Sequence, residues 1–392
     1  MTQRILFVVN QGAFFVTHRL ELAVSVRDAG YEVHIALPTG DAEQGWLRSL
    51  GFTVHGVPID RTNMNPFGEL AVIASLVMLY RRVRPHLVHH VTVKPVLFGS
   101  IAARIAGVPA VVNAVSGLGF LFIGDGRFSG AKRRAAFAAY RFALHHPHIT
   151  VIFQNADDRF AFINARVISE AQTVLIPGSG VNLLDFAQAP EPNGVPVVML
   201  TGRMLWHKGI GEFVAAARLL RAANVNARLV LVGGTDVNPS SVSEVQLHEW
   251  HADGVIEWWG QRDDMPAVLA GSTLVCLPSY REGIPKALLE AAAVGRAIVT
   301  TDTPGCRDVV RDGDNGLLVP VRSVKELANA IRLLLENPSE RGRMARRSRE
   351  RAVAEFDVSF VIKATLDVYA AALRSSSMVS MSSHPPSKSR SS

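Results

Sequence analysis

The sequence contains very little cysteine. Its 392 residues include only Cys276 and Cys306, which argues against a disulfide scaffold and for a reducing compartment. Cys276 lies in the apolar run Leu274–Leu277, which indicates a buried position. Cys306 follows a Pro-Gly pair and is expected in a loop or at a helix start. Cysteine and histidine spacings typical of zinc sites are also missing, so the sequence predicts no zinc site.

Long apolar runs are missing as well. No stretch approaches the ~20 consecutive apolar residues of a membrane-spanning helix. The first apolar run, Ile5–Val9, is too short for the apolar core of a signal peptide. We therefore expect a cytoplasmic protein that is soluble or peripheral on the inner face of the cell membrane.

Acidic residues are outnumbered by basic ones. There are 34 Asp and Glu against 41 Lys and Arg, which gives a formal net charge of +7. This excess favours an anionic partner, such as a nucleotide diphosphate, a lipid pyrophosphate or an anionic membrane. Nucleic acid ranks last among the anionic partners and is not expected, because the sequence contains no recognisable nucleic-acid-binding module.

Short apolar, β-branched runs alternate with helix-forming segments along the whole chain. This alternation predicts parallel sheets covered by helices, and the length favours two domains. The expected strands of the first half are Ile5–Val9, Tyr31–Leu37, Phe52–Val57, Leu87–His90, Ala110–Ala114, Ile149–Gln154 and Thr173–Ile176. Those of the second half are Val197–Leu200, Arg228–Val232, Val255–Trp259, Leu274–Leu277, Ala297–Thr301 and Gly316–Pro320.

Residues 278–302 contain the most informative pattern. A helix-forming segment there has Pro285 in its first turn and Gly295 at its exit, positions that these residues favour. Glu282 precedes the helix, where free backbone N–H groups favour a diphosphate. Glu290 lies over a turn deeper, where a carboxylate can accept hydrogen bonds from two vicinal sugar hydroxyls. Spacing alone favours two surface glutamates, but the surrounding Gly-Ile-Pro-Lys and Thr-Thr-Asp favour a site.

This segment resembles the signature of the retaining GT-B glycosyltransferases of family four, which include bacterial polysaccharide and lipid-linked oligosaccharide transferases. The matching residues are Glu282-Gly283-Ile284-Pro285-Lys286, Leu288-Leu289-Glu290-Ala291, Thr300-Thr301-Asp302 and Pro304-Gly305-Cys306-Arg307-Asp308. The resemblance covers most of the chain and is strongest in the second half. It implies an α/β protein with two Rossmann-like β/α/β domains that face a central cleft, and a C-terminal helix that crosses back to the first domain.

The domain boundaries follow from this resemblance and from composition. A Pro- and Gly-rich stretch, Gln188–Pro196, is the expected linker. We expect an acceptor-binding domain over residues 1–188, a nucleotide-sugar-binding domain over 196–356 and the returning helix over 357–374. The tail, 375–392, has ten serines in eighteen residues and is expected to be disordered.

The resemblance also implies roles for residues on the donor side. Arg203 and Lys208, five apart on one loop, would grip the diphosphate. Glu282 would hold sugar hydroxyls and stabilise positive charge at the anomeric carbon, so these three are the expected catalytic residues. Glu290 would anchor the ribose. The other expected donor-binding positions are Gly12, Gly233, Arg262, Gly283, Ile284 and Pro285, with backbone amides at the 282–285 helix start on the diphosphate.

Five residues of the first domain are expected on the acceptor side. His18 and Arg19 lie one turn into the first expected helix, and His90, Lys94 and Ser116 fall at the carboxyl ends of strands. A solvated lysine is an equally good interpretation of Lys94, and a structural role is common for single histidines. Ser116 departs from the family pattern, since many members have a histidine there that contacts the donor sugar. The Ser-Gly-Leu-Gly-Phe form at 116–120 resembles the subgroup that acts on polyprenyl-diphosphate-linked sugars.

The segment 127–148 combines basic and aromatic residues. Arg127, Arg134 and Arg141 repeat every seven residues, which places them on one helical stripe, and Phe137 and Tyr140 lie on another. A basic amphipathic helix can lie on an anionic membrane surface. The alternative, which the sequence favours slightly for the helix as a whole, is a domain helix with a solvated basic face and an apolar face in the core.

The expected function is that of a retaining glycosyltransferase in surface polysaccharide or oligosaccharide biosynthesis. It would move a hexose or N-acetylhexosamine from a nucleotide-diphosphate sugar, preferably a UDP-sugar, to a polyprenyl-diphosphate-linked saccharide. No metal or other cofactor is expected, because the Asp-x-Asp dyad of the other major transferase fold is missing. The alternatives are a GT-B-type nucleotide-sugar epimerase or hydrolase, and a non-catalytic nucleotide-sugar- or lipid-binding subunit. A nicotinamide dehydrogenase is disfavoured because the Gly-x-Gly-x-x-Gly fingerprint is missing.

Overall fold

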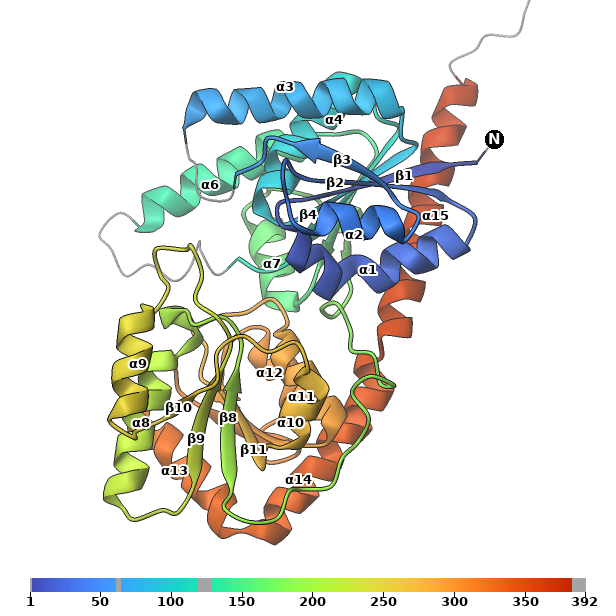
Figure 1. The fold of residues 1–392 in the computed structure, drawn as a ribbon. Helices are drawn as coiled ribbons and strands as arrows, with labels where there is room; N and C mark the ends of the chain where they lie inside the picture. The colour runs from blue at the N-terminus through green and yellow to red at the C-terminus, as the bar shows by residue number, and fades with distance from the viewer. Residues whose placement is uncertain (1, 61–64, 119–128, 383–392) are drawn as a thin grey trace, which may run out of the picture.

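The structure is a computed structural model that describes residues 2–60, 65–118 and 129–382. It contains two parallel sheets, one in each half of the chain, with helices on both faces of each sheet (Figure 1). The seven strands of the first sheet have the order β3-β2-β1-β4-β5-β6-β7, and the six of the second have the order β10-β9-β8-β11-β12-β13. Every strand pair is parallel, as the β/α alternation predicts.

The first domain follows the order in which the sequence alternates. Its elements are β1 (Arg4–Val9), α1 (Gly12–Asp28), β2 (Glu32–Pro38), α2 (Glu43–Ser49), β3 (Thr53–Val57), α3 (Pro66–Val83), β4 (Leu87–Val91), a π-helical turn (Pro95–Gly99), α4 (Ser100–Ala106), β5 (Ala110–Val115), α6 (Ser129–Ala143), β6 (Ile149–Phe153), α7 (Ala156–Asn164) and β7 (Thr173–Leu175). The central strands β1 and β5 are buried along almost their whole length because helices cover both faces.

The second domain repeats this architecture. Its elements are β8 (Val197–Thr201), a 3₁₀ turn (Trp206–Lys208), α8 (Ile210–Ala222), β9 (Arg228–Val232), α9 (Glu244–Ala252), β10 (Glu257–Trp258), α10 (Met265–Ala270), β11 (Leu274–Leu277), α11 (Lys286–Val294), β12 (Ala297–Thr301), α12 (Cys306–Val309), β13 (Gly316–Val319), α13 (Val324–Glu336) and α14 (Pro338–Arg351).

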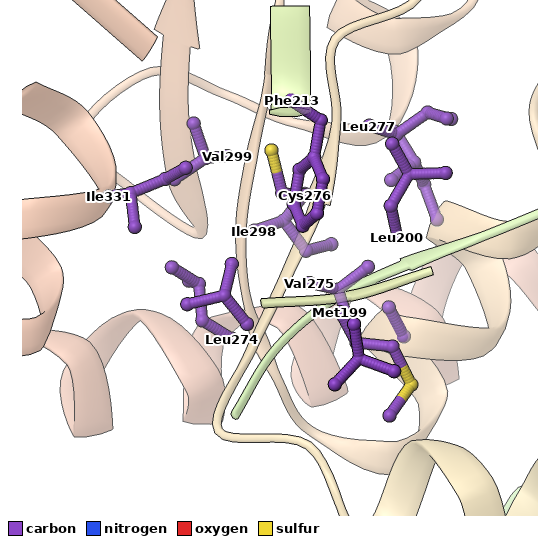
Figure 2. Packing of buried hydrophobic residues seen from close by; sticks show 14 of the residues in the cluster. Met199, Leu200, Phe213, Leu274, Val275, Cys276, Leu277, Ile298, Val299 and Ile331 are labelled. Carbon is purple, nitrogen blue, oxygen red and sulfur yellow. The ribbon is translucent and has the colours of Figure 1, made fainter. Parts of the chain in front are cut away.

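The core of the second domain is a continuous layer between sheet and helices. Figure 2 shows Phe213 of α8 beside Cys276 of β11, and Ile331 of α13 beside Val299 of β12. All four are fully buried. The expectation that Cys276 is a packing residue is therefore confirmed, and burial raises the pKa of its thiol.

The chain crosses between the domains twice, and the two crossings lie against each other. Val181 of the first crossing donates its N–H to the carbonyl of Phe356, and Val358 donates back to Val181. The last helix, α15 (Val358–Ser382), then runs along the first domain (Figure 1). It buries Tyr369 against β4, where its hydroxyl forms a hydrogen bond with His89.

The structure differs from the sequence expectation in the tail. We expected disorder from residue 375, but α15 continues to Ser382. The hydroxyl of Ser375 donates to the carbonyl of Ala371 (3.0 Å), and that of Ser376 to Leu373 (2.9 Å). Serine side chains can thus bond within a helix, and the first proline of the tail stands only at position 385.

One strand is shorter than its apolar run. We expected a strand over Val255–Trp259, but β10 consists of Glu257 and Trp258 alone. The N–H groups of Val255 and Ile256 donate to the carbonyl of Trp250 at the end of α9. They are therefore used by the helix exit and not by the sheet.

Candidate functional site

Each sheet contains one switch point, where the strand order reverses. It lies between β1 and β4 in the first sheet and between β8 and β11 in the second. Ligands of open parallel sheets bind in the crevice beyond the carboxyl ends of such strands. The loops that follow β8 and β11 carry Arg203, Lys208 and Glu282, so the expected catalytic residues converge on the switch point of the second domain.

Lys208 and Glu282 form an ion pair at this switch point. The Lys208 ammonium lies 2.5 Å from Glu282 Oε1, and both side chains are more than four-fifths buried. Ser279 donates its hydroxyl to the same carboxylate oxygen (2.6 Å). The carboxylate and ammonium are thus fixed in one place by the 3₁₀ turn after β8 and the loop after β11. An ion pair that is held in this way presents both charges to whatever binds beside it.

Arg203 lies on the same loop but pairs with a different carboxylate. Its guanidinium is half exposed and donates to Asp236 Oδ2 (2.7 Å), whereas the Asp236 side chain is 5% exposed. Asp236 accepts a further hydrogen bond from the N–H of Asn238 (2.9 Å). The acid is therefore an anchored counter-ion that orients Arg203 at the mouth of the crevice.

Glu290 lies in the second turn of α11 and is almost fully buried. Lys286, one turn earlier, donates to its carboxylate at 2.6 Å. Burial raises the pKa of Glu290, and the Lys286 ammonium opposes that rise. Lys286 thus provides the charge that favours the carboxylate form of Glu290 in a buried position.

The backbone amides at the start of this segment differ from the expectation. We expected amides of residues 282–285 to bind the diphosphate. The N–H of Glu282 instead donates to Pro304 O (3.2 Å), and that of Ile284 donates to Gln154 Oε1 (3.2 Å). Pro285 has no N–H. The helix proper begins at Lys286 without a side-chain cap, so the helix end that favours an anion lies one or two residues further along the chain.

Gly233 marks a close approach of the loops after β8 and β9. Its φ is +144°, and a Cβ atom there would lie 1.8 Å from the carbonyl oxygen of Gly202. Trp258 donates its indole N–H to Gly233 O (2.9 Å). Arg262, on the loop after β10, forms a bidentate, exposed ion pair with Asp264. These contacts fix the loops in which backbone groups are expected to hold a nucleobase.

His18 and Arg19 lie at the junction of the two domains. Both line a cavity of about 160 Å³ between α1, the crossing loop, Lys286 and α15. Burial, together with the charges of Arg19 and Lys286, lowers the pKa of His18 to about 3. His18 is therefore neutral at physiological pH and stacks on Phe14 with ring centroids 4.1 Å apart.

Two of the expected acceptor-side residues belong to the interior of the first domain. His90 is fully buried and bonds to Tyr80 Oη (2.9 Å) and Asn113 Oδ1 (2.8 Å). Lys94 donates to Glu69 Oε1 (2.6 Å) within a largely buried ion pair. Strand β4 points the His90 side chain into the core, where both ring nitrogens have partners, and its acceptor-side role stays a prediction. Lys94 is neither a solvated lysine nor an uncompensated charge.

The backbone N–H of Gly12 has a partner within the first domain. Its N–H, at the start of α1, donates to Asp41 Oδ2 (2.8 Å), and a Cβ atom at Gly12 would lie 2.0 Å from Asp41 Oδ1. The helix start that we expected beside the donor phosphates thus already holds a carboxylate. Asp41 is thus the present partner of the Gly12 amide, and the donor-binding role of Gly12 stays a prediction.

Ser116 lies where the first domain contacts the loop between β11 and α11. This loop, residues 278–285, carries Glu282 and is named the glutamate loop. A Cβ atom on Gly283 would lie 2.2 Å from the Ser116 carbonyl oxygen. The Ser116 hydroxyl is buried and has no hydrogen-bond partner in the described ranges. A buried hydroxyl without a partner is costly, which makes this position a candidate for ligand contact.

Several residues that support the site have no role in the sequence-based prediction. Asp236 and Ser279 orient Arg203 and Glu282, and a turn of the first domain, Gln154–Asp158, contacts the glutamate loop. Only Asn155 carried a usable signal. Asn followed by two acidic residues is typical of a helix N-terminus, and Asn155 does cap α7.

No helix within residues 2–60, 65–118 and 129–382 has both the length and the apolar character needed to cross a membrane. The same ranges contain no cluster of three or more His, Cys, Asp or Glu side chains that could hold a metal ion.

Comparisons with known proteins agree with this arrangement. Residues 195–337 match the family model described as "Glycosyl transferases group 1", and residues 4–155 match "Glycosyl transferase 4-like". Over 381 residues, the chain is 30% identical to the N,N'-diacetylbacillosaminyl-diphospho-undecaprenol alpha-1,3-N-acetylgalactosaminyltransferase of Campylobacter jejuni. That alignment covers 93% of this chain and 98% of the relative. A UDP-Gal:alpha-D-GlcNAc-diphosphoundecaprenol alpha-1,3-galactosyltransferase of Escherichia coli is 25% identical over 70% of this chain and 73% of its own length.

Solved structures show the same fold. Anabaena Alr3699/HepE in complex with UDP and glucose superposes with a TM-score of 0.76 at 20% identity, over 94% of this chain and 99% of that one. The lipopolysaccharide glycosyltransferase WaaG superposes with a TM-score of 0.72 at 17% identity, over 92% and 98% of the two chains. Fold and site therefore define a two-domain glycosyltransferase of the GT-B class. The chain belongs to the group 1, family-four-like glycosyltransferases, as the signature at 282–308 predicted.

Proposed function

We propose that this glycosyltransferase moves a hexose or N-acetylhexosamine from a UDP-sugar to a polyprenyl-diphosphate-linked saccharide, with retention at the anomeric carbon. The Lys208–Glu282 pair at the switch point of the second domain carries the proposal. The names of the C. jejuni and E. coli relatives specify diphospho-undecaprenol-linked acceptors, and the second specifies a UDP-sugar. These names support the donor and the acceptor class.

The reaction needs charge stabilisation on the leaving group. As the bond between C1 and the diphosphate oxygen breaks, negative charge grows on the diphosphate. Lys208, Arg203 and the uncapped start of α11 are arranged to receive that charge. The acceptor hydroxyl forms the new bond to C1 on the same face, and its proton passes to the leaving diphosphate oxygen. Glu282 holds the sugar and stabilises positive charge at C1. The cations supply what a metal ion would otherwise supply, so chelators should leave activity unchanged.

One experiment separates this proposal from its alternatives. A panel of nucleotide sugars is incubated with the protein, with and without lipid extract from membranes, and release of nucleotide diphosphate is measured. Release that depends on the lipid extract is the expected result. Release at the same rate without lipid would indicate the epimerase or hydrolase, and binding without release would indicate a nucleotide-sugar-binding subunit.

The Glu290 carboxylate is expected to accept hydrogen bonds from the ribose hydroxyls. Because burial raises its pKa above the usual 4.5, protonation begins at a higher pH than for an exposed glutamate. UDP affinity should therefore fall as the pH is lowered towards that raised pKa. Glu290→Gln should bind UDP roughly 10-fold more weakly at neutral pH, the effect expected for a lost charged acceptor.

The Glu290→Gln variant also controls for protonation of the ligand. Protonation of UDP itself affects both proteins equally, so only the difference between wild type and Glu290→Gln reports the carboxylate. Calorimetry with UDP and 2′-deoxy-UDP should show strong discrimination by the wild type and weak discrimination by the variant. Equal discrimination by both would contradict the ribose role.

The proposal places the protein on the inner face of the membrane that carries the acceptor, through α6 and the adjacent α3. Both helices pack on the turn that precedes α4. The exposed residues of these two helices combine Lys132 and Arg134 with Phe142, Met78 and Phe67, a mixture suited to an anionic bilayer. Arg127, the first residue of the predicted basic stripe, lies outside the described residues.

Lys132→Glu with Arg134→Glu should lower the affinity for anionic vesicles, measured by sedimentation, by roughly 30-fold or more. Each basic residue near such a surface contributes about 1 kcal/mol, and a loss of about 2 kcal/mol corresponds to that factor. Binding to neutral vesicles provides the baseline. Lys325→Glu, an exposed lysine on α13 of the second domain, is the matched control and should not change sedimentation. Equal sedimentation of the double variant and the wild type would contradict the proposed contact between α6 and the membrane.

A further inference from the structure

A turn of the first domain is bonded directly to the glutamate loop of the second. The turn connects β6 to α7 and includes Gln154 and Asn155, and Asp158 follows in the first turn of α7. These three polar side chains reach the backbone or side chains of Arg281–Ile284. The contact therefore joins the domain expected to bind the acceptor to the residue expected to stabilise the transition state.

Asn155 uses both ends of its amide. Oδ1 accepts from the N–H of Asp158 (2.8 Å) and so caps α7, while Nδ2 donates to Gly283 O (2.9 Å), to Asp158 Oδ2 (3.2 Å) and to Glu282 O (3.4 Å). A backbone N–H can only donate and a carbonyl can only accept, so the orientation of this amide is fixed by its partners. The side chain is buried, and its two roles are separable by substitution.

Asp158 adds an ion pair across the same contact. Its Oδ1 lies 2.5 Å from an Arg281 guanidinium nitrogen, and its Oδ2 accepts from the N–H of Leu118 (3.2 Å). The carboxylate is 1% exposed and Arg281 is 14% exposed. Asp158 thus ties two segments of the first domain to the residue that immediately precedes Glu282.

The two backbones meet with no room for side chains. A Cβ atom on Gly117, whose φ is +132°, would lie 2.9 Å from the backbone nitrogen of Gly283. A Cβ atom on Gly283 would lie 2.3 Å from Gln154 Oε1. Glycine on both sides allows the glutamate loop to lie directly on the first domain.

We propose that Asn155 and Asp158 are positioning residues that hold the glutamate loop. They keep the Glu282 carboxylate in its catalytic position only when the two domains are in contact. The inference rests on the proposed function. Lys208 and Ser279 hold the side chain of Glu282 from the second domain, whereas Asn155 holds its backbone from the first. Transfer then requires both lobes, while binding of the nucleotide needs only the second.

Asn155→Asp tests this inference with little change in shape. Aspartate keeps the cap of α7, because it is as good an N-cap as asparagine, but it cannot donate to Gly283 O. We expect kcat to fall roughly 10-fold or more, as for a buried carbonyl that loses its donor, and the Kd of UDP to stay within about 2-fold. Hydrogen–deuterium exchange of the amides at 282–284 should become faster.

Two further variants keep the result interpretable. Asn155→Ser also keeps the cap and adds no charge beside Asp158, so it should change kcat and exchange in the same direction. Asp157→Asn alters the neighbouring exposed residue in the first turn of α7 and should behave as the wild type. Wild-type rates in both Asn155 variants, with unchanged exchange, would overturn the inference, and so would a higher kcat. A wild-type protein that transfers no sugar would instead refute the proposed function, and the exchange measurement would still test the contact.

Discussion

Replacing Lys208 with alanine is expected to lower kcat by about 100-fold or more, the effect seen when a fixed group that stabilises transition-state charge is removed. Arg203→Ala should have an effect of similar size, because Arg203 reaches the same crevice from the same loop. Both losses should appear in kcat and in kcat/KM, since the diphosphate carries more charge in the transition state than in the bound donor.

The controls for these two variants come from the same domain. Arg228 is also a half-exposed arginine paired with a carboxylate, Glu257, but it stands at the opposite end of the sheet. Arg228→Ala should therefore keep kcat. Thermal unfolding must show that Lys208→Ala is folded, because it leaves Glu282 with Ser279 as its remaining side-chain donor. A folded Lys208→Ala protein with wild-type kcat would contradict the leaving-group role.

Glu282→Gln is expected to reduce kcat by a comparable factor. The amide has the size of the carboxylate and can still accept from the Ser279 hydroxyl, but it carries no charge to offset positive charge at C1. It also removes the partner of Lys208, so the ammonium becomes free to bind the diphosphate more tightly. We therefore expect an unchanged or lower Kd for UDP together with the lower kcat.

This combination distinguishes a catalytic carboxylate from a structural one. Glu257→Gln, which alters a carboxylate that accepts from Arg228 and Trp259, should change neither quantity. If Glu282→Gln weakened UDP binding and kcat in parallel with a large fall in unfolding temperature, Glu282 would be a structural residue. The measurement is a set of steady-state rates and calorimetric titrations at one pH.

The second half of the fold could be predicted closely from the sequence. Its strands are short buried runs bounded by glycine and proline, and Pro285 and Gly295 mark the two ends of α11. The convergence of Glu282, Arg203 and Lys208 was also predictable, because each lies in a loop that follows a strand. Residues after parallel strands meet at one edge of the sheet, so local sequence determines their neighbourhood.

The acceptor side could not be predicted in the same way. His90 and Lys94 stand at or after the carboxyl end of β4, but His90 faces Tyr80 and Asn113 in the core and Lys94 meets Glu69 of α3. Which way a strand-end side chain points depends on partners far away in the sequence. The partner of the Gly12 amide was beyond prediction for the same reason, since Asp41 reaches the start of α1 from the loop after β2.

The contact between the domains was also beyond sequence analysis. Asn155 signals a helix cap, but nothing near it indicates that its amide also donates to Gly283, 128 positions away. Gly117 and Gly283 are each typical of an ordinary turn. Only the structure shows that both are needed for the close contact between the two backbones. Long-range contacts of this kind are set by the packing of the two lobes.

The central claim is that an anionic leaving group is captured beside the start of α11 by Lys208 and Arg203. A crystal structure of the full chain with UDP tests it most directly. We expect both phosphates within hydrogen-bond distance of those two side chains and of the first amides of α11, with the ribose hydroxyls on Glu290. A diphosphate bound elsewhere, for example at the start of α1, would contradict the account.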